Sequence, residues 1–290
     1  MEVPGGLDAT PAGVQATERA WRVIRPHEGW WPGLRLRELW TYRELGLMLA
    51  LRDLQLRYRQ TLFGVAWAVL QPLAAMLAFS WVFGQVAGIP SEGLPYAAFV
   101  LSAVALWFFL STAVSAAAES LVEHSDLITR VWFPRPLAPI AAVLAAIVDL
   151  LIGLSLLAPV MAIEGIAPPL EVLTLPLWLL GGVLLAIGAG LWLAAMNVLY
   201  RDVRYAMAFL LQLWLFVSPV VFPSSLVDDP WRWVFALNPA AGLIDGLRWA
   251  LLGAPAPGAE LFVSLASLLA VLFGGIVYFR RVERRFADRI

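Results

Sequence analysis

The sequence predicts an all-α integral membrane protein, because its composition is strongly apolar and its apolar residues gather into long uncharged stretches. Of the 290 residues, 61% are hydrophobic and 14% are charged, and the mean hydropathy is +0.79. A soluble domain carries about 25% charged residues, and a soluble core of this size could not bury so much apolar surface. Six stretches approach or exceed the ~20 residues with which a helix crosses a bilayer.

The chain begins with a polar and basic segment and then a predicted interfacial helix. Residues 1–33 form the expected N-terminal tail, which lacks the basic start and apolar core of a secretory signal. Residues 34–60 predict an amphipathic helix lying in the membrane interface. Its apolar residues at helical spacing are Trp40, Leu47, Leu51, Leu54 and Tyr58. The alternative, an amphipathic helix on a soluble domain, is disfavoured because no soluble domain follows.

Residues 61–290 contain the six predicted transmembrane helices. They are residues 61–91, 93–118, 136–163, 172–200, 205–227 and 261–279. Only the third stretch contains a charged residue, Asp149. A shorter uncharged run, Trp233–Ile244, contains Asn238 and Pro239 and is too short to span. It predicts a re-entrant or interfacial segment.

The distribution of arginine predicts the orientation. All 20 basic residues are arginine, and 18 of them lie before the first stretch, between the second and third, between the fourth and fifth, or after the sixth. Basic residues gather in cytoplasmic loops, so a multi-pass protein with both termini in the cytoplasm is expected. No internal repeat is visible, which gives an inverted-repeat secondary transporter no support.

Several kinds of chemistry are excluded by composition. The chain has no lysine, so it cannot form the GxxxxGK[ST] phosphate-binding loop. It has no cysteine, and its two histidines, His27 and His124, are far apart, so no metal site is expected. No Ser/His/Asp grouping occurs, so no catalytic residue is predicted on this chain, and no nucleic-acid partner is expected.

The loop between the second and third stretches has a helical pattern. Glu119–Pro136 reads ESLVEHSDLITRVWFPRP. The residues that can share one face are Leu121, Leu127, Ile128 and Val131. Two prolines, Pro134 and Pro136, then end the pattern. It predicts a short amphipathic cytoplasmic helix with a rigid exit, and the alternative is a plain surface connector.

Six collinear stretches resemble the permease of ABC type-2 exporters of polysaccharides and polyol phosphates, which export O-antigen, capsule or teichoic acid. They are LRDLQLRYRQTLFGVAWAVLQP at 51–72, LITRVWFPRPLAP at 127–139, LYRDVRY at 199–205, LQLWLFVSPVVFP at 211–223, LNPAAGLIDGLRWALLG at 237–253 and FRRVERRFADRI at 279–290. Each stretch alone is weak support for the resemblance. All six stretches in the same order, together with six predicted spans, make the resemblance specific. Residues 1–33 lie outside the resemblance.

The resemblance implies a homodimer of permeases in the bacterial cytoplasmic (inner) membrane, with two separate nucleotide-binding ATPase subunits. ATP and Mg²⁺ would sit on those subunits, so this chain is expected to be no enzyme and to hold no cofactor. The implied substrate is a polyprenyl-pyrophosphate-linked cell-envelope polysaccharide, moved outward across the membrane, and membrane lipids are further expected partners. A permease for a drug or small lipid, and a structural or sensing membrane protein, are the alternatives.

The resemblance also implies roles for two segments. The loop helix at 119–136 becomes the coupling helix seated in the ATPase, and the interfacial helix shares in that docking. The expected coupling residues are Leu121, Leu127, Ile128, Arg130, Phe133 and Pro134. External re-entrant helices are implied around Trp233–Ile244.

Three arginines end the predicted interfacial helix, and we expect them to bind the lipid-linked pyrophosphate. Arg52, Arg57 and Arg59 lie shortly before the first span, at the depth of a lipid headgroup. A guanidinium binds phosphate oxygens through two parallel hydrogen bonds. The alternative is that they only set topology and attract anionic lipids, or that Asp53 pairs with Arg57.

Polar and aromatic residues within the stretches are candidates for a glycan channel, because pyranose rings stack on aromatic planes. They are Tyr58, Trp67, Gln71, Trp81, Trp107, Phe108, Gln212 and Trp214. Lipid contact, core packing and bridging between helices are the alternatives. Asp149 is an intramembrane acid that either serves function or is protonated or hydrogen-bonded to a neighbouring helix. Asp245 and Arg248 are spaced to form a structural pair.

Overall fold

Helices are the only regular elements in the part of the chain that the computed structural model describes, so the all-α prediction is confirmed there. The described residues are 36–59, 64, 66–125, 132–200, 202–283 and 286. All of them lie in one unit, Pro32–Ile290. The predicted tail, residues 1–33, lies outside them.

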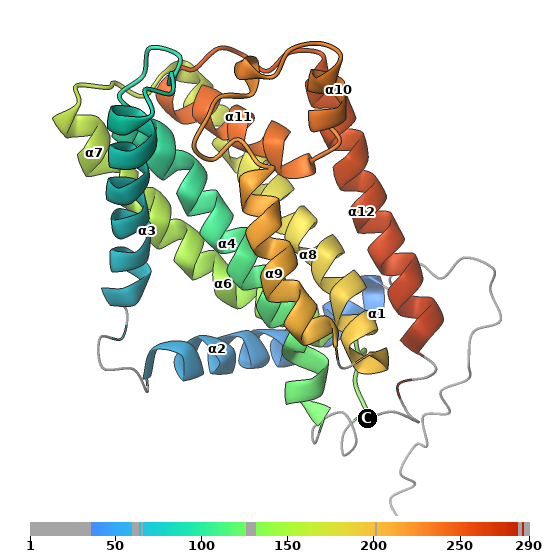
Figure 1. Cartoon of the computed structure of the whole chain (residues 1–290). Coiled ribbons are helices and arrows are strands. Elements are labelled where there is room, and N and C mark those ends of the chain that lie inside the picture. The colour runs from blue at the N-terminus through green and yellow to red at the C-terminus, as the bar shows by residue number, and fades with distance from the viewer. Residues whose placement is uncertain are drawn as a thin grey trace, which may run out of the picture. The chain divides into compact units, whose positions relative to one another are not determined.

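The predicted interfacial helix is present as two helices, α1 (Leu36–Thr41) and α2 (Arg43–Arg59). Figure 1 shows α2 lying crosswise at one end of the bundle. It packs on α6 (Leu137–Ser155) through Gly46, Leu49 and Ala50. A Cβ at Gly46 would lie 3.0 Å from a methyl carbon of Leu137, so the glycine permits this close approach.

The face of α2 away from α6 is mixed. Leu47 and Leu51 on it are exposed, and so are Glu44 and Arg52. The helix therefore has apolar residues both packed on the chain and open, rather than on the single apolar face that was predicted.

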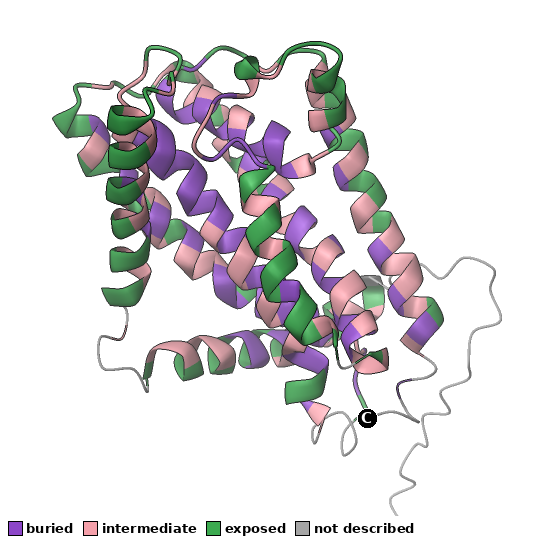
Figure 2. Cartoon of the chain, in the orientation of Figure 1, coloured by how far each residue is buried: buried purple, intermediate pink, exposed green. Residues whose placement is uncertain are grey.

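The centre of the bundle is α4 (Tyr96–Glu123), which packs on α6, on α8 (Leu175–Leu199) and on several shorter helices. Figure 2 shows its length as almost continuously buried. Small residues at the contacts allow the helices to approach closely. Ala105 of α4 faces Gly153 of α6, and Ala117 faces Gly190 of α8.

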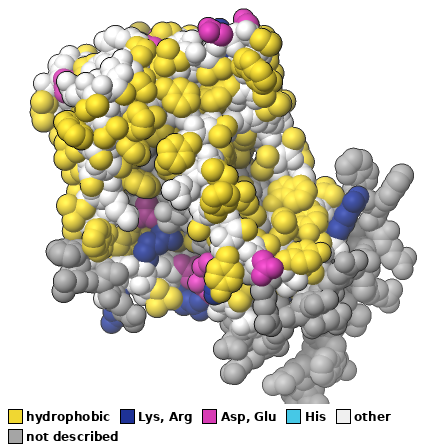
Figure 3. Space-filling view, viewed as in Figure 1, with side chains coloured by type: hydrophobic (Ala, Val, Ile, Leu, Met, Phe, Trp, Pro, Cys, Tyr) yellow, Lys and Arg dark blue, Asp and Glu magenta, His cyan; other side chains and the backbone are white. Residues whose placement is uncertain are grey.

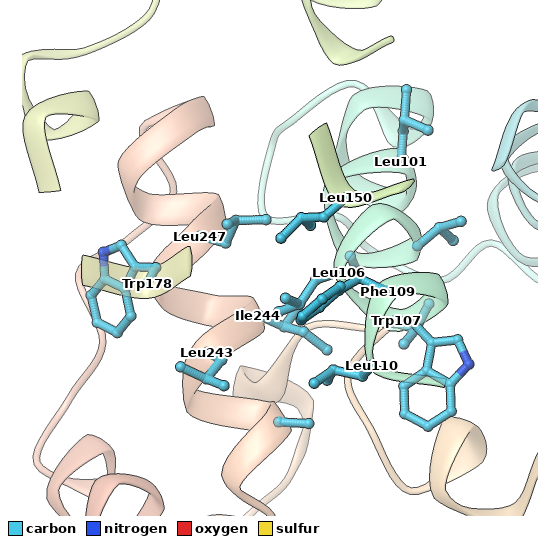
Figure 4. Close-up of a cluster of buried hydrophobic side chains, with 14 of the residues drawn as sticks. Leu101, Leu106, Trp107, Phe109, Leu110, Leu150, Trp178, Leu243, Ile244 and Leu247 are labelled. Atoms are coloured by element: carbon cyan, nitrogen blue, oxygen red, sulfur yellow. The ribbon is translucent and has the colours of Figure 1, made fainter. Parts of the chain in front are cut away.

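A second helix closes the core at the far end of the bundle from α2. This is α11 (Pro239–Leu252), most of whose residues are buried. In the cluster of Figure 4, Ile244 of α11 lies with Leu106 and Phe109 of α4. A short helix, α10 (Trp231–Phe235), precedes α11 at this end.

Five of the six predicted spans are confirmed as helices long and apolar enough to cross a membrane. They are Ala66–Val86, Tyr96–Glu123, Leu137–Ile163, Leu170–Leu199 and Glu260–Glu283. The elements not yet named within them are α3 (Ala66–Phe79), the π-helical η1 (Ser80–Val86), α7 (Leu157–Ile163), the 3-10 helix η2 (Leu170–Thr174) and α12 (Glu260–Glu283).

The helix expected over 205–227 is shorter than predicted. It is α9 (Val203–Phe216), whose 14 residues rise roughly 21 Å, less than the ~30 Å of a bilayer core. Pro219 and Pro223 follow, and neither can donate a helical hydrogen bond. A turn therefore continues to the 3-10 helix η3 (Ser224–Leu226), and a sixth span stays a prediction.

Asn238 divides the short run Trp233–Ile244 into the two helices α10 and α11. Its side-chain oxygen accepts from the Ala240 backbone N–H and from the Trp214 indole N–H. Pro239 follows as the first helical residue of α11, where its missing N–H costs nothing. The Asn238 side-chain nitrogen donates to the Val217 carbonyl and to the Ser218 hydroxyl. Asn238 thereby joins the end of α9 to the start of α11.

The predicted pair of Asp245 and Arg248 is found, with 3.9 Å between Oδ1 and Nη1. Arg248 is only 2% exposed and also donates to the backbone carbonyls of Phe99 and Val220. Its guanidinium carbon lies 3.4 Å from the centre of the Phe99 ring. The residue therefore ties α11 to α4, which supports the structural role expected for the pair.

Replacing Gly188 by alanine is expected to destabilise the bundle by about 1–3 kcal/mol, because the added methyl would overpack a helix contact. The new Cβ would lie 2.7 Å from the Leu272 Cα, so α12 itself would have to shift. Gly182→Ala, on the same helix, would place its Cβ 3.0 Å from the Leu106 Cδ1, a side-chain atom that can move, and in ordinary contact with Phe109. Thermal unfolding of the purified protein in detergent measures the difference. Equal stability of both variants would contradict the close approach of α8 and α12.

Candidate functional site

Two side chains at the end of α2 donate to one carboxylate within α6. Arg57 Nη1 donates to Asp149 Oδ2, and the Tyr58 hydroxyl donates to Asp149 Oδ1. Of the alternatives for Asp149, hydrogen bonding to a neighbouring helix is the one that the structure shows. Its partner is a charged side chain, so the intramembrane acid forms an ion pair between α2 and α6.

This ion pair lies in the wall of a cavity of about 190 Å³. The other walls come from α3 and α4, which pack on each other. The lining residues of α3, α4 and α6 each include a pair spaced four apart, which places both members on one helix face. These pairs are Trp67 and Gln71 of α3, Phe108 and Thr112 of α4, and Asp149 and Gly153 of α6.

The cavity therefore combines a charged end with aromatic and amide walls. Arg57, Tyr58 and Asp149 provide charge and hydrogen-bonding groups, while Trp67 and Phe108 provide ring surfaces. A guanidinium beside aromatic rings suits a ligand that has both an anionic group and an apolar or sugar surface. Figure 3 shows charged side chains gathered mostly toward one end of an otherwise apolar face.

The three arginines that were expected to act together have different surroundings. Only Arg57 lines the cavity, while Arg59 is exposed. Arg52 Nη2 lies 2.7 Å from His124 Nε2. Asp53 lies 3.7 Å from Arg52 and 3.5 Å from His124, while Arg57 pairs with Asp149, so the anticipated pairing of Asp53 with Arg57 is not the one found.

His124 is a site residue that sequence reasoning missed. It ends α4, is buried, and its Nδ1 lies 2.7 Å from the Ser120 carbonyl oxygen. In the neutral ring, Nδ1 then carries the proton and Nε2 accepts from Arg52. A single histidine carries no pattern, so the sequence offered no signal for this contact. Through it α2 is joined to α4 as well as to α6.

The eight channel candidates divide into three groups. Tyr58, Trp67, Gln71 and Phe108 line the cavity. Trp107 and Trp214 pack edge to face with 5.4 Å between ring centres, and Trp107 is 5% exposed, so this pair belongs to interior packing. Trp81 on η1 and Gln212 on α9 are exposed.

The coupling residues are only partly visible. Leu127, Ile128 and Arg130 lie outside the described residues. Leu121 and Phe133 are 0% and 4% exposed and belong to a cluster with Phe279 and Phe286, and Pro134 is buried too. Because α4 continues to Glu123, Leu121 belongs to that helix and faces the chain's own core. This corrects the expectation that Leu121 and Phe133 lie on a docking surface.

No group of three or more potential metal ligands occurs in the described part of the chain. The site consists of the Arg57 guanidinium, its internal counter-ion Asp149, aromatic rings and a cavity. Its elements, α2, α3, α4 and α6, bring together residues from Arg57 to Gly153.

Comparison with known proteins identifies relatives along most of the chain. Over 262 residues it is 30% identical to the O-antigen export system permease protein RfbA of Myxococcus xanthus, covering 88% of this chain and 98% of that protein. RfbA of Klebsiella pneumoniae is 21% identical over 248 residues, covering 84% and 94%. The polysialic acid transport protein KpsM of Escherichia coli is 24% identical over 242 residues, covering 81% and 92%.

A family description matches the helical unit itself. Residues 45–252, which include the whole cavity and more than half of the chain, match the family described as ABC-2 type transporter. The apolar helices long enough to span a membrane agree with that match. The chain belongs to the ABC-2 type transporter family.

Proposed function

We propose that this chain is the permease subunit of an exporter that moves a polyprenyl-pyrophosphate-linked polysaccharide outward across the bacterial cytoplasmic membrane. The relatives named as permeases for O-antigen or as a polysialic acid transport protein support the substrate class. The observation that carries the proposal is the cavity at the end of α2, where a guanidinium lies beside aromatic rings. Both termini are cytoplasmic in this proposal, which puts α2 at the inner leaflet.

The cavity suits the junction between the lipid carrier and the first sugar. Arg57 binds phosphate oxygens through parallel N–H groups, and Trp67 and Phe108 offer ring faces to a pyranose. Its volume of about 190 Å³ is below the roughly 300–1,000 Å³ of common ligand pockets, which fits a headgroup rather than a polymer. A passage for the polymer would then lie elsewhere.

A second copy of the chain is the proposed source of that passage. Helices α3 and α9 are mostly exposed, and each exposes a glutamine, Gln71 or Gln212. A side-chain amide facing lipid tails is unfavourable because its hydrogen bonds are unmet. Contact with a second copy, or with a polar passage between two copies, removes that cost and supports the homodimer.

The energy source in this proposal is a pair of separate ATPase subunits that hold ATP and Mg²⁺. The chain has no lysine and so no phosphate-binding loop of its own. The coupling role of the segment 119–136 stays a prediction.

The purified chain is expected to hydrolyse no ATP, because it lacks that loop. Release of phosphate from ATP should rise only after the ATPase subunit is added. ATP hydrolysis by the chain alone, in a preparation free of contaminating ATPases, would refute the proposal that ATP is hydrolysed on separate subunits.

Disulfide cross-linking tests the homodimer against a clean background, because the chain has no cysteine. Gln212→Cys on α9 should give a dimer on a non-reducing gel after mild oxidation in the membrane. Phe262→Cys on α12 is the control, since Phe262 is 75% exposed but lies on a helix that the proposal leaves facing lipid. Equal cross-linking at both positions would argue against an α9 interface.

Arg57→Lys should lower export and lipid-stimulated ATP hydrolysis about 10- to 100-fold, because losing a charge-assisted hydrogen bond costs about 1.5–3 kcal/mol. Arg59→Lys is the matched control, because Arg59 is exposed and lies two residues further along α2. Expression and membrane orientation should stay normal in both variants, since each keeps the charge. If Arg57→Lys exports at the original rate, the arginine serves only as a membrane anchor.

A further inference from the structure

We propose that the ion pair of Arg57 and Asp149 is a latch that senses the substrate headgroup. Asp149 occupies Arg57 in the resting chain, and an anionic headgroup takes its place and releases the end of α2 from α6. The inference rests on the proposed function, in which Arg57 receives the lipid pyrophosphate.

The geometry of the pair resembles that of a bound anion. Asp149 presents two oxygens, one to the Arg57 guanidinium and one to the Tyr58 hydroxyl. Two oxygens of a phosphate group can accept from the same two donors. A carboxylate of the chain therefore holds the place in which an anionic ligand would be bound.

The pair is accessible to such a ligand. The Arg57 side chain is 26% exposed and the Asp149 side chain 16%, and both line the cavity beside Trp67 and Gln71. A headgroup entering the cavity meets the pair directly, without any need to open the core.

The rest of α2 is held by a different kind of contact. Gly46, Leu49 and Ala50 pack against Leu137, Ala141 and Ala145 of α6 through apolar atoms. Leu54, three residues before Arg57, also packs against the cluster of Leu49, Ala50, Ala141 and Ala145. Loss of the ion pair should therefore loosen only the end of α2 after Leu54, while the part before it stays docked.

The exchange favours ligands with more charge than Asp149. Any anion that binds Arg57 must first displace Asp149, so the loss of the Arg57–Asp149 attraction is the same for all of them. A phosphodiester lipid carries one negative charge, as Asp149 does, so its attraction to Arg57 is little stronger than the one it replaces. A pyrophosphate diester carries two negative charges and more acceptor oxygens, so it has more to gain from the guanidinium. The latch should stay closed among ordinary anionic phospholipids and open with a lipid pyrophosphate.

A second contact joins α2 to α4 just before the released end. Arg52, five residues before Arg57, lies 2.7 Å from His124 Nε2 at the end of α4. His124 lies within residues 119–136, the segment predicted to be the coupling helix. Movement at the end of α2 would therefore reach that segment through Arg52 and His124.

Spin labels on α2 test the latch in the full-length chain in nanodiscs of zwitterionic lipid. Leu56→Cys lies in the turns held by the ion pair, and Leu47→Cys lies in the half that packs on α6. Both leucines are 55% exposed, which makes them a matched pair. Polyprenyl pyrophosphate should increase label mobility at position 56 and leave position 47 unchanged. Phosphatidylglycerol should leave both unchanged.

Asp149→Asn should give the mobile signal at position 56 without any ligand, because the amide carries no charge to hold Arg57. Position 47 should again be unchanged, which shows that the variant is folded. In the complex with its ATPase, the same variant should raise substrate-independent ATP hydrolysis severalfold. Asp149→Glu, which keeps the charge, should restore the low rate.

Two results separate the latch from the function on which it rests. Unchanged mobility at position 56 and unchanged basal hydrolysis in Asp149→Asn would refute the latch. If Asp149→Asn frees position 56 but polyprenyl pyrophosphate does not, the latch stands and the proposed ligand is wrong.

Discussion

The close contact of α4 with α6 and α8 is the constraint on which the site depends. In a bilayer the helices gain little from hiding apolar surface, so they associate through tight packing of small residues. Ala105 against Gly153 and Ala117 against Gly190 bring the helix backbones together. Gly153 lies one turn after Asp149, so the same contact that joins α4 to α6 sets Asp149 beside Phe108 and Thr112. The cavity walls follow from this packing, with α3 and α2 placed against them.

Much of the fold was predictable because a membrane allows few structures. A long uncharged stretch must satisfy its own backbone hydrogen bonds, which makes it a helix. The end of α9 was not predictable from hydropathy, since residues 217–227 are as apolar as a span. Pro219 and Pro223 break the helix there, and hydropathy does not register a missing N–H donor.

The sequence allowed most residues of the site to be predicted, but not the contacts between them. Arginines at a headgroup depth, an intramembrane acid and aromatic residues were each visible in the sequence. The contact of Arg57 with Asp149 joins residues 92 positions apart, so no local spacing reveals it. An apolar residue such as Leu121 predicts burial but does not say against what, and the structure buries Leu121 inside the chain. His124 escaped notice because one histidine carries no pattern.

Asn238 has a mechanical consequence for the end of the bundle opposite α2. Its oxygen accepts two hydrogen bonds and its nitrogen donates two, which uses the full capacity of the amide. Aspartate would lack the donors, and leucine would lack every bond. The hinge that the turn after Phe216 would otherwise provide is thereby locked. Because these hydrogen bonds join the two segments, a displacement of the end of α9 also displaces the start of α11.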